Sequence, residues 1–392
     1  MNLELYCGCL IQLIRAAFSG ETPENLPKEI DVDILLDAAK RHSVANIIYE
    51  PLKSMGILDP ESEKKLKALY NIALMNDIVQ SHYLDIVTDA FEENEIPHCV
   101  MKGPVIKEIY PRPDFRQSSD LDIHVPERYR ERARDIMLQL GFKIERFNSA
   151  DADDVYFIGK KIHIELHRIL VSNKTPWQKE CQKITDRLVL KENKRYTYEM
   201  TAEDYYLYMI AHMAKHMLYS GMGIKMVLDI WVYMKNYSEI LDKNILRERL
   251  SLCGLEEFEE NIQKLMKFWF EDETADDLIK ELGNYIFLSG TFGTKKQLDA
   301  YFYAQNAGKS NSPVIAKAVY YWKFFFMPYK WMCNRYPILG KIPVLLPFCW
   351  VHRALKTLIF EREKAHNISS KYDNVDLGES KKIRNFKKEI GL

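Results

Sequence analysis

Residues 116–125 read RQSSDLDIHV and place two aspartates one residue apart within an apolar segment. Asp120 and Asp122 flank Leu121, and Ile123 and Val125 follow. Alternate residues of a β-strand point to the same face, so the two carboxylates would project together, roughly 6–7 Å apart at the backbone. The three apolar side chains would enter the core from the other face. The stretch therefore predicts a strand with one acidic face and one buried face.

Two carboxylates held together repel each other unless a cation lies between them. Mg²⁺, a hard cation that prefers oxygen ligands, is the natural partner. If the pair serves a metal, replacing both aspartates should leave the metal-free fold as stable as before, or more stable. The alternative is a strand with one solvated face, because an Asp-x-Asp motif alone is a weak signal.

A second stretch, KIHIELHRI at residues 161–169, repeats this alternation. Isoleucine and leucine occupy one face, and His163, Glu165 and His167 occupy the other. If this strand lies beside the first, Glu165 completes a site of three carboxylates. Such a site can hold two metal ions about 3.5–4 Å apart for in-line displacement at phosphorus. A solvated edge strand with ordinary polar residues is the alternative.

The hydrophobic pattern divides the chain into five regions. Residues 1–95 are expected to be helical, because stretches 35–52 and 61–95 carry apolar residues at a spacing of three and four. Residues 96–195 are expected to contain both strands and helices. The predicted strands are 98–101, 121–125, 142–147, 154–159 and 161–169, and the predicted helices are 104–110 and 126–140. Residues 196–300 form a second helical region, 301–360 an aromatic-rich helical region, and 361–392 a charged tail. This order predicts an α+β fold in which helical regions flank a small mixed sheet.

Two parts of the C-terminal half carry specific expectations. The aromatic segment 319–336 is interpreted as helical core, with a membrane-surface patch and an RNA-stacking surface as alternatives. The tail segment KYDNVDLGESKK, residues 371–382, is expected to be unstructured because it is charged and poor in apolar residues.

Composition excludes several classes of protein. The 392 residues carry a formal net charge of −1, so no overall basic field attracts nucleic acid or anionic lipid. Seven scattered cysteines indicate reduced thiols and a cytoplasmic location. The N-terminus carries no basic segment typical of a signal peptide. The run IPVLLPFCWV near the C-terminus is about half as long as a membrane-spanning helix, so no transmembrane segment is expected.

Three segments in a fixed order resemble the polymerase-β-like nucleotidyltransferase superfamily, particularly its large uncharacterised bacterial branch. They are MKGPVIKEIYPRPDFRQSSDLDIHV at 101–125, a helix ending in LQLGF at 138–142, and HIELH at 163–167. The resemblance is close over residues 98–170 and less specific over 30–95 and 200–235. It implies an enzyme that uses Mg²⁺ or Mn²⁺ to move a nucleoside monophosphate from a nucleoside triphosphate (NTP) to a hydroxyl acceptor, releasing pyrophosphate.

The resemblance also implies roles for individual residues. Asp120 and Asp122 match the two metal-ligating aspartates, and Glu165 matches the third carboxylate, which helps to hold the second metal and activates the acceptor hydroxyl. Gly103 matches the glycine that opens the helix beside the nucleotide's phosphates. The further candidates for nucleotide contact around this loop are Lys102, Arg116, Ser118 and Ser119.

One departure from the family pattern supports a different function. The residue after the glycine is commonly serine or glycine, and here it is Pro104, which offers a phosphate neither an N–H nor a hydroxyl group. The alternative is therefore a non-catalytic protein on the same fold that binds a nucleotide or another partner.

A helix expected from residue 201 to 219 carries a polar stripe that contains Tyr208, His212, Lys215 and His216. In the resembled superfamily a helical domain closes over the nucleotide, so His212, Lys215 and His216 are candidates for contact with base, ribose or phosphate. The acceptor could be a small molecule, a protein side chain or an RNA end, and the sequence leaves open which.

Two further expectations concern histidines and a buried acid. A metal hydrolase that uses His163, His167, His212 and His216 is a third possible function. Asp229, within the apolar segment VLDIWV, needs a partner, for which Lys225 and His216 are the candidates.

Overall fold

The computed structural model describes residues 2–23, 26–147, 153–159, 162–171, 175–291, 293–294, 297, 315, 318–319, 322, 325–360 and 377–392. Its contacts divide the chain into two units. The first comprises Met1–Met217, Gly221–Phe292 and Ile390–Leu392, and the second comprises Leu218–Ser220 and Gly293–Glu389. All residues of the candidate site belong to the first unit.

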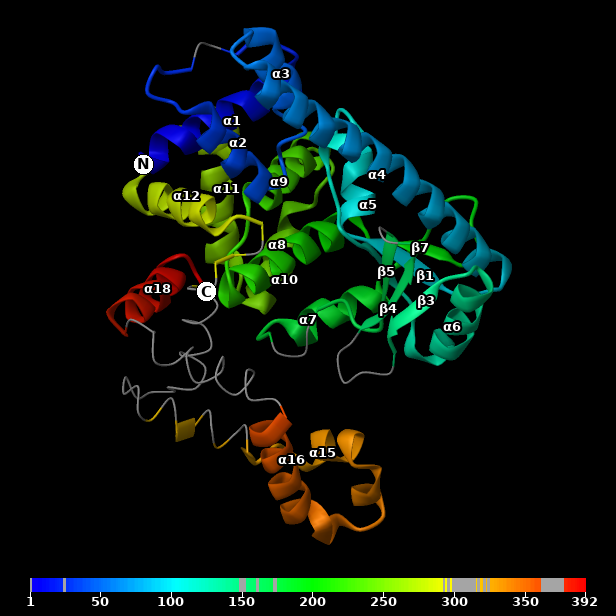
Figure 1. Ribbon diagram of the computed structural model, residues 1–392. Coiled ribbons are helices and arrows are strands. Elements are labelled where there is room, and N and C mark those ends of the chain that lie inside the picture. The colour runs from blue at the N-terminus through cyan, green and yellow to red at the C-terminus, as the bar shows by residue number, and fades with distance from the viewer. Residues whose placement is uncertain are drawn as a thin grey trace. The chain divides into compact units, whose positions relative to one another are not determined.

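A mixed seven-stranded sheet forms the centre of the first unit (Figure 1). Its strands are β1 (His98–Met101), β2 (Leu121–His124), β3 (Lys143–Arg146), β4 (Asp153–Ile158), β5 (Ile162–His167), β6 (Val189–Leu190) and β7 (Thr197–Glu199). Their order across the sheet is β3-β4-β5-β2-β1-β7-β6. The β2–β5 and β1–β7 pairs are parallel, and the others are antiparallel. The predicted α+β class with a mixed sheet is confirmed.

The sequence prediction missed β6 and β7. They contain only two and three residues, which is too short for a recognisable alternation of apolar and polar side chains. They extend the sheet beyond β1 and lead the chain into the helices that follow.

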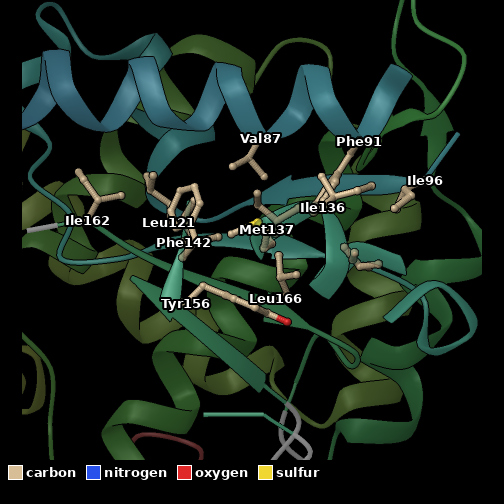
Figure 2. Packing of buried hydrophobic residues seen from close by; sticks show 14 residues of the cluster. Val87, Phe91, Ile96, Leu121, Ile136, Met137, Phe142, Tyr156, Ile162 and Leu166 are labelled. Atoms are coloured by element: carbon tan, nitrogen blue, oxygen red, sulfur yellow. The ribbon is translucent and has the colours of Figure 1, made fainter. Parts of the chain in front are cut away.

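The apolar face of the sheet packs beneath the long helix α4 (Pro60–Glu93) and beside α6 (Arg130–Gln139). Val87 and Phe91 of α4 point into this core (Figure 2). As expected, the residues of β2 that alternate with the acids are buried there: Leu121, Ile123 and, just after the strand, Val125. Burial on one face fixes the register of β2 and β5, because a shift of one residue would bring their charged side chains into the core.

Short helices connect the strands. Helix α5 (Gly103–Ile106) follows β1 directly, and the 3₁₀ turns η1 (Lys107–Ile109) and η2 (Pro113–Phe115) lead to β2. The 3₁₀ turn η3 (Glu127–Tyr129) precedes α6, and α7 (Gln178–Gln182) with η4 (Lys183–Asp186) follows β5.

Three helices precede α4. They are α1 (Leu3–Ser19), α2 (Val32–Arg41) and α3 (Tyr49–Met55). The stretch 35–52 is thus not one continuous helix: α2 ends at Arg41, and Ser43 adopts a left-handed backbone with φ 57°. Helix α4 begins where Asp59 accepts hydrogen bonds from the backbone N–H groups of Glu61 and Ser62, with Pro60 at the first helical position.

Five helices follow the sheet in the first unit. They are α8 (Ala202–Tyr219), α9 (Ile224–Tyr237), α10 (Lys243–Cys253), α11 (Glu256–Phe270) and α12 (Asp277–Ser289). The helix expected at 201–219 is α8. Its Leu207, Ile210 and Met217 are buried, as the apolar stripe predicts.

The described part of the second unit contains α15 (Tyr329–Arg335), η5 (Pro337–Gly340), η6 (Pro343–Leu345), α16 (Leu346–Phe360) and α18 (Leu377–Glu389). Met332, Leu339 and Cys349 form a small core there, whereas Trp322 and Trp331 of the aromatic segment are exposed. The expectation of an unstructured tail is wrong from Leu377 onward, where α18 begins, and residues 371–376 lie outside the described residues. No helix in the part of the chain that the structure describes is long and apolar enough to cross a membrane.

Candidate functional site

Two carboxylates and a histidine meet on the polar face of the sheet. Parallel pairing of β2 with β5 places Asp122 opposite Glu165 and His124 opposite His167. Among the residues described, Asp122, Glu165 and His167 each offer a ligand atom within 4.8 Å of the others. Asp122 and His167 are buried, while 24% of the Glu165 side chain is exposed. The site is therefore buried on one side and open at Glu165.

Asp120 precedes β2 and is half-buried. Its carboxylate accepts a hydrogen bond of 2.8 Å from the hydroxyl of Ser119 and is not part of the three-residue group above. Burial acts to lower the pKa of both Lys102 and Lys225, and the negative charge of Asp120 acts weakly in the opposite direction on each of them. Convergence of Asp120 with the other two carboxylates stays a prediction.

Two cationic side chains neutralise Asp122. Lys102 Nζ lies 2.5 Å from Oδ1 of Asp122, and His167 Nε2 lies 2.6 Å from the same oxygen. Burial alone would raise the pKa of Asp122, but Lys102 and His167 outweigh it and hold that pKa well below its usual range. Asp122 is therefore ionised at neutral pH, even in a buried position.

His167 is held between carboxylates on both sides of its ring. Its Nδ1 lies 2.7 Å from Oδ1 of Asp153, while Nε2 approaches Asp122 and also lies 3.4 Å from Oε2 of Glu165. Both ring nitrogens can donate only in the protonated imidazolium form. Burial and Lys102 lower the pKa of His167, but its hydrogen bonds to the three carboxylates raise it to about 10.

These ion pairs correct one expectation. Replacing both aspartates was predicted to leave the metal-free fold as stable as before, or more stable. That prediction assumed that the two carboxylates repel each other and have no cationic partner. Asp122 is instead the shared partner of Lys102 and His167, so its removal would leave two cations without their buried counterion.

The loop at Lys102 and Gly103 is tightly packed. Lys102 has a left-handed φ of 54°, and its carbonyl accepts a hydrogen bond of 2.8 Å from the hydroxyl of Tyr205. A Cβ atom added to Gly103 would lie 2.0 Å from Oγ of Ser118, so only glycine fits without displacing that serine. Gln80 of α4 fixes the same serine by donating to its carbonyl at 2.9 Å. The structure thus brings together three of the residues predicted for nucleotide contact.

Arg116 is bound to a buried acid. Its Nε lies 2.6 Å from Oδ1 of Asp229, and the hydroxyl of Tyr110 donates to the same oxygen at 2.6 Å. The expected partners of Asp229, Lys225 and His216, are therefore wrong. Arg116 Nη1 also donates to the carbonyl of Gln117 at 2.7 Å, so its guanidinium is fixed beside the loop rather than extended into solvent.

On the polar stripe of α8, His212, Lys215 and His216 are half-buried, and Lys215 lies within the field of the carboxylates. Burial and Lys102 lower the pKa of Lys215, while Asp153, Asp122 and Glu165 act to raise it. His212 and His216 contact each other through their Nε2 atoms at 3.1 Å, and burial lowers the pKa of both. The three acids therefore act on Lys215. That His212, Lys215 and His216 line the site and contact a nucleotide stays a prediction.

Two polar groups here were absent from the site predicted from sequence. Tyr208 has a buried hydroxyl with no hydrogen-bond partner among the residues that are described, and the charges of Lys102 and Asp122 both act on it. Asp153 belongs to β4, whose register opposite β5 places it beside His167. Asp153 precedes the strand expected at residues 154–159, and only the pairing of β4 with β5 shows that it lies beside His167.

Among the residues that the structure describes, no histidine-based metal site is assembled. His163 contacts Glu145 at 3.4 Å and stacks on Phe157. His212 and His216 contact each other, but in the described residues no third ligand joins them. Within the described ranges, the one group suited to a metal contains two carboxylates and one imidazole.

The chemistry of this donor set fits a hard divalent cation. Oxygen ligands from the two carboxylates suit Mg²⁺ or Mn²⁺. The protonated His167 has no free lone pair for a metal and instead holds the carboxylates in place. The buried, ionised Asp122 requires positive charge beside it, which Lys102 and His167 supply here.

Comparison with known proteins agrees with this geometry. The profile of a family described as "Uncharacterised nucleotidyltransferase" matches residues 28–271, which include the N-terminal helices from α2, the whole sheet and the helices up to α11. Comparisons with curated proteins and with solved structures give no significant match. Because the family profile covers more than half of the chain, the protein belongs to this uncharacterised nucleotidyltransferase family.

Proposed function

We propose that the protein transfers a nucleoside monophosphate from an NTP to a hydroxyl acceptor, with Mg²⁺ or Mn²⁺ as cofactor and pyrophosphate as the second product. The observation that carries the proposal is the pairing of Asp122 with Glu165 across two parallel strands, beside the loop of Lys102 and Gly103. Membership of a nucleotidyltransferase family supports the same reaction class.

In this proposal Asp122 and Glu165 hold the divalent ion, with Asp120 as the third acid at the start of the strand. The bound ion would neutralise charge on the phosphates and favour attack at the α-phosphorus. Asp122 suits this role because its ionised state is already secured at neutral pH. His167, which contacts both acids and Asp153, would orient them.

Glu165 is the residue proposed to accept the acceptor's proton, because it is the more exposed of the two central carboxylates. As the acceptor oxygen forms its bond to the α-phosphorus, the bond to the bridging oxygen breaks. The electron pair leaves with pyrophosphate, and the hydroxyl proton passes to Glu165. Positioning and electrostatic stabilisation supply most of the rate in phosphoryl-type transfers.

The loop residues are proposed to hold the triphosphate. Lys102 provides a point charge, and the hydroxyls of Ser118 and Ser119 provide donors that Pro104 lacks. Arg116 supports Ser118, whose Oγ lies 3.3 Å from its Nη1. On α8, His212, Lys215 and His216 are proposed to contact base, ribose or phosphate.

The test uses nucleotides labelled at the α-phosphate, and separately at the γ-phosphate, incubated with the purified protein and cell extract. Nucleotidyl transfer labels an acceptor from the α-position alone and releases labelled pyrophosphate from the γ-position. Glu165→Gln should abolish labelling while binding persists. Labelling from the γ-position would indicate phosphoryl transfer and contradict the proposal. The labelled product identifies the acceptor as a small molecule, a protein or an RNA end.

One observation favours a second candidate, a non-catalytic protein that binds a nucleotide or another partner. Oδ1 of Asp122 is already bonded to both Lys102 and His167, so the acid is neutralised without a metal. For this candidate, NTP binding should be independent of Mg²⁺ and no acceptor should become labelled.

A further inference from the structure

A lysine outside the predicted site is half-buried and has no carboxylate partner among the residues that the structure describes. Lys225 lies in the first turn of α9, and its Nζ donates a hydrogen bond of 3.1 Å to the carbonyl of Gln117. In the described parts of the chain, no carboxylate oxygen lies within 4.0 Å of this ammonium group. Withdrawing an ammonium group from water is unfavourable unless it is paired, so Lys225 requires a functional explanation.

The nearest acid on the same helix is already used. Asp229 lies one turn further along α9, but its Oδ1 accepts hydrogen bonds from both Arg116 and Tyr110 at 2.6 Å. The positive charge of Arg116 acts on Lys225, whereas the carboxylate of Asp229 is bound to Arg116. The positive end of the α9 dipole adds further positive potential at this point.

The physical result is an excess of positive charge. Burial and Arg116 lower the pKa of Lys225 to about 7, and Asp229 and Asp120 only partly oppose them. A bound anion would reverse this imbalance by supplying the counterion that the protein lacks.

Lys225 lies beside the candidate site. Its bonding partner Gln117 immediately precedes Ser118, whose side chain packs on Gly103. His216 lies close enough to these lysines to be affected by their charge. Burial lowers its pKa to about 4, and the positive charges of Lys215, Lys102 and Lys225 contribute to this lowering. Three lysines from separate segments, the β1–α5 loop, α8 and α9, therefore lie around one region next to the acids.

We propose that Lys225 binds the terminal phosphates of the triphosphate, as part of an anion subsite that the sequence pattern did not indicate. The proposal rests on the proposed function and names the part of the substrate, a polyphosphate, that this residue recognises. Asp229 and Tyr110 act as positioning residues, because the carboxylate of Asp229 is bound by Arg116 and Tyr110 and so leaves the ammonium group of Lys225 for the substrate.

The test compares dissociation constants for an NTP, the matching NMP and inorganic tripolyphosphate, measured by calorimetry with Mg²⁺ present. The variants are Lys225→Met, which keeps the length of the side chain, and Lys225→Arg, which keeps its charge. Lys235→Met, an exposed lysine on the same helix, is the matched control. A lost charge-assisted hydrogen bond predicts roughly 10- to 100-fold weaker binding of NTP and tripolyphosphate by Lys225→Met. NMP affinity should change less than about twofold, and Lys225→Arg and Lys235→Met should bind like the wild type.

The outcomes separate this inference from the proposed function. If Lys225→Met binds NTP and tripolyphosphate as tightly as the wild type, the subsite is refuted even when transfer is observed. If the wild type binds tripolyphosphate through Lys225 but labels no acceptor, the subsite stands and the transferase proposal fails. A wild type that binds neither ligand refutes both.

Discussion

Asp122 and Glu165 are direct neighbours across the parallel strands β2 and β5, and His167 contacts both of them from the same face. The arrangement follows from the register, which the buried Leu121, Ile123 and Ile164 fix on the opposite face. An apolar core thus determines where the two acids meet.

Asp122→Asn should destabilise the metal-free protein. The change leaves Lys102 and His167 without a shared buried counterion, which costs roughly 3–5 kcal/mol when a buried pair is broken. Urea denaturation at pH 7 measures the free energy of unfolding. Asp120→Asn is the control, since Asp120 is half-buried with a hydroxyl partner, and should stay within about 0.5 kcal/mol of wild type. Equal stability of Asp122→Asn and wild type would contradict the ion pairs.

His167→Gln should also lower stability, by roughly 3 kcal/mol, because Asp153 and Asp122 lose the imidazolium that lies between them. His163→Gln on the same strand is the matched control, because the His163 side chain is 41% exposed. The two variants are compared by denaturant unfolding at pH 7. Similar losses from both would show that the carboxylates around His167 contribute little.

Gly103→Ala should cost about 1–3 kcal/mol, because the new methyl group would meet Oγ of Ser118 at 2.0 Å and its Cβ at 3.2 Å. Ser118→Gly removes both atoms, so the double variant should recover most of the loss. A double-mutant cycle in thermal or urea unfolding measures this coupling. Additive effects of the two changes would show that the loop avoids the clash by another route.

Lys225→Met should stabilise the protein in a pH-dependent manner. Since the pKa of Lys225 is lowered from 10.5 to about 7, the unfolded chain binds one more proton than the folded chain between these pH values. Wild-type stability therefore rises across this interval, and the advantage of Lys225→Met is largest below about pH 7 and vanishes near pH 10.5. Unfolding free energies measured at pH 6, 8 and 10 for wild type, Lys225→Met and Lys235→Met test this. If the difference in unfolding free energy between Lys225→Met and wild type were the same at all three pH values, the lowered pKa of the half-buried Lys225 would be contradicted.

The sequence was informative wherever a pattern is local. The alternation in β2 and β5 predicted the strands and the faces of Asp122 and Glu165, and the three-and-four spacing predicted α4, α6 and α8. The resemblance indicated that Gly103 opens a helix beside the phosphates, but the close approach of Ser118, fifteen residues away, could not be predicted.

Partnerships between distant segments could not be derived from sequence. Lys102 and His167 meet on Asp122 from a loop and a separate strand, and Arg116 reaches Asp229 on α9. The strands β6 and β7 are too short to show an alternation of apolar and polar residues. Lys225 cannot be distinguished in the sequence from any other lysine near the start of a helix, because its surroundings are set by the fold.

The central claim is that Asp122 and Glu165 hold a divalent ion together with an NTP. Its most direct test is the melting temperature of the wild type, Asp122→Asn and Glu165→Gln with each of the four NTPs, in Mg²⁺ and in excess chelator. Binding to the folded state raises apparent stability by mass action. At least one NTP should raise the melting temperature of the wild type with Mg²⁺ and not with chelator. Glu165→Gln should keep part of that shift, and Asp122→Asn should lose it. A full wild-type shift in Asp122→Asn, or a shift that persists in chelator, would contradict the claim.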